Sequence, residues 1–67
     1  MPKSIRMISA AVRFRRFRKA KRMSQGMLAL CLGISQRAVQ YIERGTYRPT
    51  LRHLNEFEAL VERHKEN

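Results

Sequence analysis

Acidic residues are scarce in this 67-residue sequence, above all in its first 52 residues, where Glu43 stands alone against thirteen lysines and arginines. The formal net charge of the chain is +10. Such a large charge on so small a protein favours a polyanionic partner. The other four glutamates lie in the last fifteen residues. This distribution indicates a basic body and a mildly acidic tail that faces away from the partner.

Cysteine is also nearly absent, since Cys31 is the only one. A single thiol cannot form an internal disulfide, so we expect a reducing cytoplasmic environment and interpret Cys31 as a small, inert, partly buried hydrophobic residue. The sequence has no apolar run of about 18 residues that would span a membrane. Basic residues interrupt the N-terminal stretch before it forms the apolar core of a signal peptide. We therefore expect neither membrane association nor an export signal.

The usual residue patterns of catalysis and metal binding are missing as well. His53 and His64 are eleven residues apart, without further histidines or cysteines near them, so we expect no metal site and no cofactor. No nucleophile–base pair or phosphate loop is recognisable, and a core of this size does not easily enclose an active site. We expect no enzyme and no small-molecule substrate, but a single domain over residues 1–67 with residues 1–4 flexible.

What the sequence does contain is an organised stretch from Gln25 to Arg44. Its apolar residues recur at helical spacing in two groups, and Gly33 between them marks a helix end in the left-handed conformation. Ser24 and Ser35 are good N-caps for the two helices. The positions expected to face the core are Leu28, Ala29, Leu32, Val39 and Ile42. Two short helices joined in this way form a helix-turn-helix motif, whose second helix can enter the DNA major groove.

Helices are also predicted on both sides of this motif. The first runs to about Lys21, and either Ser4 or Ser9 caps its start. The last begins after its N-cap, Thr50. The core-facing residues are Phe14 and Phe17 in the first helix, and Leu51, Leu54, Phe57 and either Leu60 or Val61 in the last. The predicted fold is therefore all-α, with four helices.

The order of residues through this region resembles the DNA-binding domains of the Cro and lambda-repressor-like (XRE) regulators. The resemblance spans roughly Phe14 to Leu60 and rests on Gln25, Leu28-Ala29, Leu32-Gly33-Ile34-Ser35, Val39, Ile42-Glu43-Arg44-Gly45 and Arg48-Pro49-Thr50-Leu51. It implies a compact four-helix, lambda-repressor-like domain with a central helix-turn-helix over residues 25–44. Gly26 departs from the family, which has a better helix former there, and should cost that helix on the order of 1 kcal/mol relative to alanine.

The resemblance also implies where DNA is contacted. The family reads bases from the start of the second motif helix and from one turn later, which corresponds here to Gln36, Arg37 and Tyr41, with Gln40 and Ser35 contacting bases or phosphate. Glutamine can pair bidentately with adenine, and arginine with guanine. Gln25 resembles the family glutamine that binds a backbone phosphate at a helix N-terminus. Further phosphate contacts are expected from Arg22, Arg44 and Arg48.

A structural ion pair is implied between Arg18 and Glu43. In families of this type, an arginine seven residues before the glutamine of the second helix pairs with the glutamate that closes the recognition helix. Glu43 is the only acid among the first 52 residues, so a specific cationic partner is expected for it on grounds of charge as well.

The function implied by the resemblance is that of a sequence-specific DNA-binding transcriptional regulator, and more specifically a repressor of the phage, plasmid or restriction-control type. Such a protein works in the bacterial cytoplasm, on the nucleoid, and blocks polymerase as a homodimer on a palindromic operator. The family's fifth helix, which often supports dimerisation, has no counterpart before Asn67. Dimer contacts through Leu60 and Val61, contacts through Ile5 and Ile8, and assembly supported only by DNA all remain open.

Three other functions are consistent with parts of the sequence. A protein- or RNA-interaction module of the same fold is the main alternative, although Gln36 and Arg37 at the groove-facing positions favour DNA. A basic amphipathic peptide on a membrane surface, built on residues 5–22, would need Phe14 and Phe17, which the core also needs. An enzyme is the least favoured, for lack of the residue patterns described above.

Overall fold

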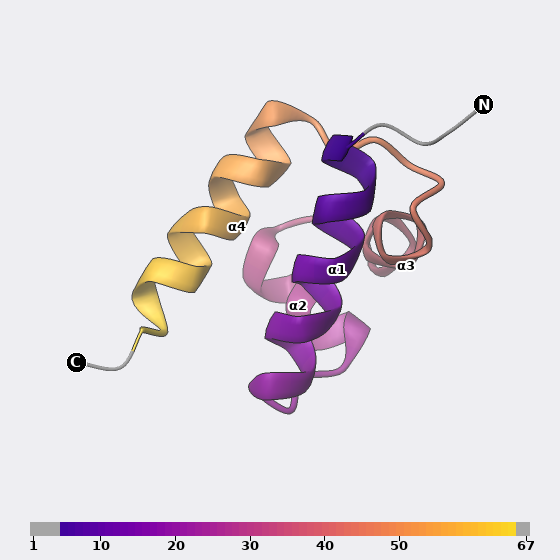
Figure 1. Ribbon diagram of the computed structural model, residues 1–67. Helices are drawn as coiled ribbons and strands as arrows, with labels where there is room; N and C mark the ends of the chain where they lie inside the picture. The colour runs from indigo at the N-terminus through magenta and orange to yellow at the C-terminus, as the bar shows by residue number, and fades with distance from the viewer. Residues whose placement is uncertain (1–4, 66–67) are drawn as a thin grey trace.

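The computed structural model describes residues 5–65, with side chains from Ser9 onward, and this part of the chain contains four α-helices and no strand. The helices are α1 (Ile5–Ala20), α2 (Gln25–Leu32), α3 (Gln36–Arg44) and α4 (Leu51–Arg63). In Figure 1, α1 runs through the centre with α3 on one side and α4 on the other, while α2 lies behind it. The predicted all-α, four-helix fold is confirmed. The predicted flexibility of residues 1–4 concerns residues outside the described range.

Three predicted N-caps start α2, α3 and α4. The side-chain oxygens of Ser24, Ser35 and Thr50 each accept a hydrogen bond from the backbone N–H three residues later, at 3.0, 3.0 and 3.1 Å. Each bond satisfies one of the donors that a helix N-terminus leaves without an intrahelical partner. The starts of these helices are therefore determined locally, by residue type.

The first three helices end in the same hydrogen-bonded turn, but with different residues at its left-handed position. Gly33 and Gly45 have φ angles of 70° and 74°, as the sequence predicts for helix-ending glycines. At the end of α1 the position is occupied by Arg22, with φ 56°. The turn there has the same pattern of bonds, from Arg22 N to Lys19 O at 3.2 Å and from Met23 N to Arg18 O at 2.8 Å. A residue with a Cβ is disfavoured in this conformation by roughly 1–2 kcal/mol.

The core lies where all four helices meet. The rings of Phe14 and Phe57 are stacked with centroids 4.4 Å apart, and Phe17 meets Phe57 edge to face at 5.6 Å. The other buried hydrophobic residues of this cluster are Ala10, Leu28, Ala29, Leu32, Val39, Ile42 and Leu60. Cys31 packs against the cluster as a partly buried free thiol. Removal of this apolar surface from water is the main favourable term for so small a fold.

Two sequence predictions about helix ends need correction. Ser9 lies inside α1 and therefore cannot be its N-cap; the alternative, Ser4, lies outside the described residues. Leu51 was expected to face the core but is 65% exposed, because it is the first residue of α4 and the packed stripe begins one turn later, at Leu54.

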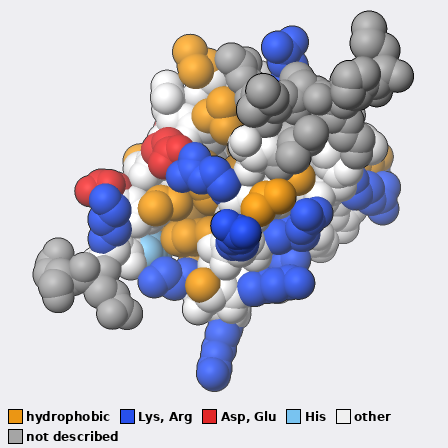
Figure 2. Space-filling view, in the orientation of Figure 1, with side chains coloured by type: hydrophobic (Ala, Val, Ile, Leu, Met, Phe, Trp, Pro, Cys, Tyr) orange, Lys and Arg blue, Asp and Glu red, His pale blue; other side chains and the backbone are white. Residues whose placement is uncertain are grey.

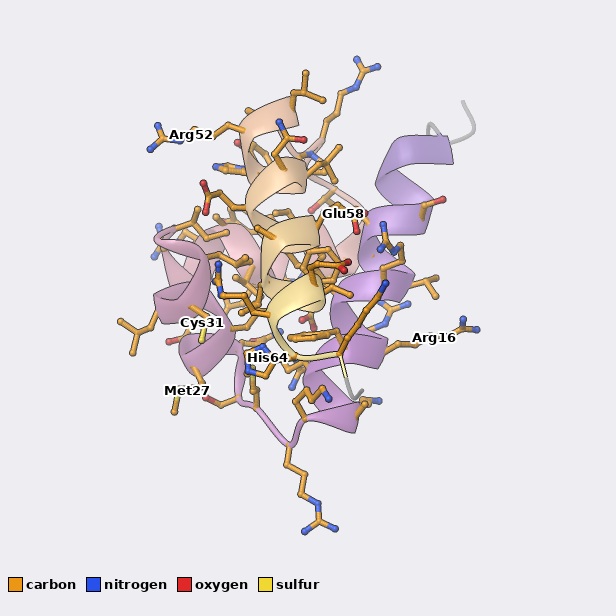
Figure 3. All side chains as sticks on the ribbon, turned by 90° about the vertical axis from the view of Figure 1, so that its left-hand side faces the viewer. Arg16, Met27, Cys31, Arg52, Glu58 and His64 are labelled. Atoms are coloured by element: carbon orange, nitrogen blue, oxygen red, sulfur yellow. The ribbon has the colours of Figure 1, made fainter. Side chains whose placement is uncertain are left out.

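An exposed ion pair joins α1 to α4. Arg13 donates from Nη1 to Glu58 Oε2, and from Nη2 to Glu58 Oε1 at 2.9 Å. Figure 3 shows Glu58 on the side of α4 that faces α1. Both side chains are about half exposed, at 47% and 52%. The hydrogen bonds from Arg13 hold the pKa of Glu58 below its ordinary value, and the same bonds raise the pKa of Arg13.

This pair predicts a pH-dependent contribution to stability. Because the folded-state pKa of Glu58 lies below its ordinary value of 4.5, the contribution is present above pH 4.5 and is lost as the pH falls through the folded pKa. For so exposed a pair we expect at most about 1 kcal/mol. Urea unfolding from pH 7 to pH 3 should show Glu58→Gln less stable than the wild type at pH 7 and equally stable at the acid end. Glu56→Gln, on the same helix, is the control. A deficit that persists unchanged in acid would contradict the assignment.

Candidate nucleic-acid interface

One face of α3 is turned to solvent. Val39 and Ile42 are fully buried on its inner side. The residues on its outer side are Gln36, Arg37, Tyr41 and Arg44, which are exposed, and Gln40, which is half-buried. These are the side chains that the sequence assigns to DNA from this helix. Their exposure follows from the helical period, since the inward pair leaves the opposite face free.

Shallow hollows flank α3 on both sides. On the α2 side, a hollow of about 450 Å³ is lined by Ser24, Gly26, Met27, Ala29, Leu30, Ile34 and Gln36. On the side of the following loop, a hollow of about 260 Å³ is lined by Ser35, Arg37, Ala38, Tyr41 and Tyr47. The helix therefore stands out as a ridge. A single α-helix of this kind fits the major groove of B-DNA, which is about 12 Å wide.

Charge is distributed unevenly around this ridge. On the face shown in Figure 2, lysine and arginine side chains spread over α1, and the acidic side chains visible there lie over α4. Because α4 and α3 lie on opposite sides of α1 in Figure 1, α1 separates these acids from α3. On α3 itself, the Arg44 guanidinium lies 5.9 Å from the centroid of the Tyr41 ring, within cation–π range.

The inner side of α3 is fixed by a buried carboxylate. Glu43 is only 4% exposed. It accepts hydrogen bonds from Arg18 Nε at 2.9 Å, from Arg18 Nη2 at 3.0 Å and from Gln25 Nε2 at 3.2 Å. Arg18 also donates to the Met23 carbonyl at 3.3 Å, and the bonds to Glu43 raise the pKa of the guanidinium. The Arg18–Glu43 pair thus links α1 to α3, and Gln25 links α2 to both.

Two interactions of this cluster were not predicted from the sequence. Arg15 donates from Nη1 to the backbone carbonyl of Glu43, and Gln25 binds the Glu43 carboxylate. Arg15 precedes Arg18 by three residues, so the two share a helix face, and that spacing was the available signal. No sequence signal indicated the bond from Gln25, because it depends on how α2 packs against α3.

The predicted phosphate-binding residues lie around α3 in three segments. Arg22 is in the turn before α2, Gln25 is the first residue of α2, and Arg48 is exposed in the loop before α4. One hydrogen of the Gln25 amide is used by Glu43, which leaves the second for another acceptor. Ser35 accepts from Ala38 N, which leaves its hydroxyl proton available. Both side chains therefore retain a donor.

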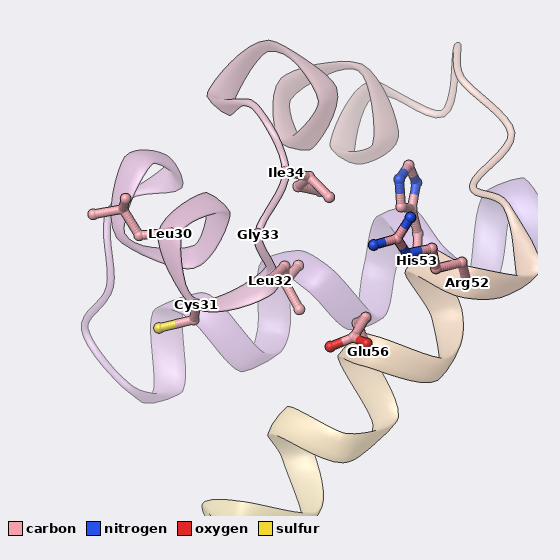
Figure 4. Close-up of a pocket in the computed structure, with 8 residues that line it drawn as sticks. All are labelled: Leu30, Cys31, Leu32, Gly33, Ile34, Arg52, His53 and Glu56. Atoms are coloured by element: carbon pink, nitrogen blue, oxygen red, sulfur yellow. The ribbon is translucent and has the colours of Figure 1, made fainter.

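A separate hollow of about 410 Å³ lies between the end of α2 and the start of α4 (Figure 4). It is lined by Leu30, Cys31, Leu32, Gly33, Ile34, Arg52, His53 and Glu56. The Cys31 sulfur points away from His53 in the close-up, so these two residues do not form a thiol–imidazole pair. The hollow contains none of the residues predicted to contact DNA. Within residues 5–65, no cluster of histidine, cysteine and acidic side chains is arranged to hold a metal ion.

Comparisons with known proteins give one match. A family model described as Helix-turn-helix (HTH_3) matches residues 14–60. No curated protein and no solved structure was similar enough to count as a match. Among the described residues, no helix combines the length and the apolar character needed to cross a membrane.

The buried pair makes a prediction for stability. The side chains of Arg18 and Glu43 are 19% and 5% exposed, and loss of one partner from such a pair typically costs about 3–5 kcal/mol. We expect Arg18→Met and Glu43→Gln each to be strongly destabilising, and the double variant to be less destabilised than the sum of the two. Denaturant unfolding in a double-mutant cycle measures this coupling, at low temperature if a single variant is marginal.

Arg16→Met is the matched control for this cycle. Arg16 lies on the same helix and points away from the rest of the protein in Figure 3. Its substitution should change stability by no more than about 0.5 kcal/mol, as is usual at the surface. Additive effects of Arg18→Met and Glu43→Gln would show that the pair does not link α1 to α3.

Proposed function

The chain belongs to the helix-turn-helix family of Cro and lambda-repressor-like (XRE) DNA-binding domains, and from this premise we propose that it is a sequence-specific transcriptional repressor that reads duplex DNA with α3. The observation that supports this most directly is the exposed face of α3, with two glutamines and two arginines. The inner side of the same helix is anchored to α1 by the Arg18–Glu43 pair. An anchored helix presents its side chains to base edges at little further entropic cost.

Base recognition is assigned to Gln36, Arg37, Tyr41 and Gln40. The Gln36 amide can donate to N7 and accept from N6 of adenine at the same time, and the Arg37 guanidinium can donate to O6 and N7 of guanine. Tyr41 is 39% exposed and offers an apolar ring edge beside Arg37. Gln40 is half-buried in the middle of α3, and its amide can bind a base or a phosphate.

Phosphate contacts are assigned to Gln25, Ser35, Arg22, Arg44 and Arg48. Gln25 lies in the first turn of α2, where unpaired backbone N–H groups and the helix dipole favour an anion. Arg22 has a left-handed backbone conformation, which a glycine would adopt with less strain. A strained residue of this kind is a reasonable candidate for a functional one.

Two copies on a palindromic operator are needed for useful specificity. At about 1.5 Å per residue, the nine residues of α3 span only a few base pairs. Of the dimer contacts considered from the sequence, Leu60 is ruled out because it is buried in the core, and Val61 is half-buried. The side chains of Ile5 and Ile8 lie outside the described part of the chain. We therefore favour assembly on DNA, which would place the protein on the nucleoid in the cytoplasm and block polymerase there.

The assignment of base-reading and phosphate-binding residues can be tested by substitution. Gln36→Ala and Arg37→Ala should each lose about 1–3 kcal/mol on the selected operator and little on random duplex. Arg48→Ala and Arg22→Gly should instead weaken binding to both kinds of DNA alike, and Arg22→Gly should also raise the thermal midpoint, because it relieves the strained turn. Fluorescence anisotropy at stated salt measures the affinities, with an RNA duplex as a further competitor.

Two results would argue against this function. One is that all four variants lose affinity by the same factor on the operator and on random duplex, because this would show that α3 reads no base. The other is tighter binding to the RNA duplex than to any DNA recovered by selection from a random pool, which would favour the RNA-interaction alternative.

The number of copies bound can be tested separately. We expect two copies on half-sites about one helical turn apart, ~34 Å centre to centre, with cooperative loading. The log affinity of the pair should fall with log salt by about 0.9 for each phosphate contact. Titration of a full palindrome and of a single half-site, with the mass of the complex measured in each case, distinguishes one copy from two. One copy on the full palindrome, bound no more tightly than on the half-site, would refute the dimer.

A further inference from the structure

Gly26 and Gln36 meet where the two helices of the motif come together. Gly26 is the second residue of α2, and Gln36 is the first residue of α3. A Cβ placed on Gly26 would lie 3.1 Å from Oε1 and 3.6 Å from Cδ of Gln36. The first distance is shorter than an ordinary van der Waals contact between such atoms. The Gln36 carboxamide therefore lies against the Cα of Gly26. Any side chain at position 26 would occupy part of the same space.

The local backbone gives no reason for a glycine at position 26. The glycines with positive φ among the described residues are Gly33 and Gly45, so Gly26 has no left-handed conformation to maintain. Within a helix, glycine is less favourable than alanine by up to about 1 kcal/mol. What Gly26 provides is the absence of a side chain beside Gln36.

We propose that Gly26 is a specificity-determining residue that acts through Gln36: the missing side chain sets where the Gln36 carboxamide lies, and so which base edge it reads. The inference rests on the proposed function, because it concerns the base that Gln36 contacts. Recognition by a planar amide demands accurate placement, within about 0.5 Å and 10–20° of the productive geometry. A methyl group at position 26, 3.1 Å from Oε1, favours another rotamer of Gln36, and a change of rotamer moves the amide by more than these limits.

The surroundings of Gln36 allow this side chain to move without moving the helices. Gln36 is exposed and borders the hollow on the α2 side of α3, whose other lining includes Met27 and Ile34. A methyl group at position 26 would therefore push the flexible carboxamide aside, and the packing of α2 on α3 would remain. Gly26→Ala is thus expected to fold and to be more stable than the wild type, with a thermal midpoint higher by up to about 4–8 °C.

The decisive measurement is the base preference of Gly26→Ala at every position of the operator. A bidentate glutamine–adenine contact gives roughly a 5- to 150-fold preference for the correct base. In Gly26→Ala we expect this preference to fall by about threefold or more at the base pair that Gln36 reads, and to stay unchanged elsewhere. In a Gln36→Ala background, Gly26→Ala should have no further effect on preference. Quantitative selection from a duplex pool gives these ratios. The wild type, Gly26→Ala, Gln36→Ala and the double variant are compared at the same salt concentration.

Asn55→Ala is the matched control for stability. Asn55 is exposed on α4, away from the motif, and its substitution by alanine also raises helix propensity. It should raise the thermal midpoint without changing any base preference. An unchanged preference in Gly26→Ala at every position would overturn the proposal, as would the same altered preference in Asn55→Ala.

A second readout needs no DNA and separates this proposal from the proposed function. In the NMR spectrum of the free protein, the side-chain amide signal of Gln36 should shift in Gly26→Ala, and the α-proton signals of Gly26 should shift in Gln36→Ala, because Oε1 of Gln36 lies against the α-carbon of Gly26. Absence of both effects would overturn the proposal even if the protein binds its operator. If both are seen and the wild type has no sequence preference, the proposed function fails, and with it the role of Gly26 in specificity.

Discussion

The arrangement of this protein depends on one buried carboxylate. Glu43 lies in the last turn of α3, where the negative end of the helix dipole disfavours an anion, and it is nearly inaccessible to water. It is stable there only because Arg18 and Gln25 donate to the carboxylate, while Arg15 donates to its carbonyl. These donors come from α1 and α2. Satisfying Glu43 therefore fixes the position of α3, and with it the direction in which the outer face of α3 points.

The same scarcity of acid determines the electrostatic character of the molecule. The ion pairs found among the described residues use Glu43 with Arg18, Glu58 with Arg13, and Glu62 with Lys65. Two of these three lie on or beside α4, which is on the opposite side of α1 from α3 in Figure 1. The surface around α3 consequently has a strong excess of cations, which suits rapid, salt-sensitive association with a duplex.

At two positions the residue present is less favourable for the local backbone conformation than another residue would be. Arg22 adopts a left-handed conformation that Gly33 and Gly45 adopt more easily in the equivalent turns. Gly26 occupies a helical position where alanine would be more favourable. Arg22 is itself assigned to phosphate, and Gly26 leaves space beside Gln36.

The sequence by itself determined whatever depends on local chemistry. N-caps at Ser24, Ser35 and Thr50, left-handed glycines, and the inward-facing Val39 and Ile42 follow from residue type and helical period, so the fold and the exposed face of α3 were predictable. The Arg18–Glu43 pairing was inferred from family resemblance and the lone acid. Only the tertiary structure showed that Gln25 and Arg15 share Glu43, that Leu51 is exposed, and that Gln36 lies against Gly26. The spacing of Arg15 and Arg18 indicated only that they share a face of α1, and not what Arg15 binds. All of these features depend on the relative positions of the helices, which are set by packing in three dimensions.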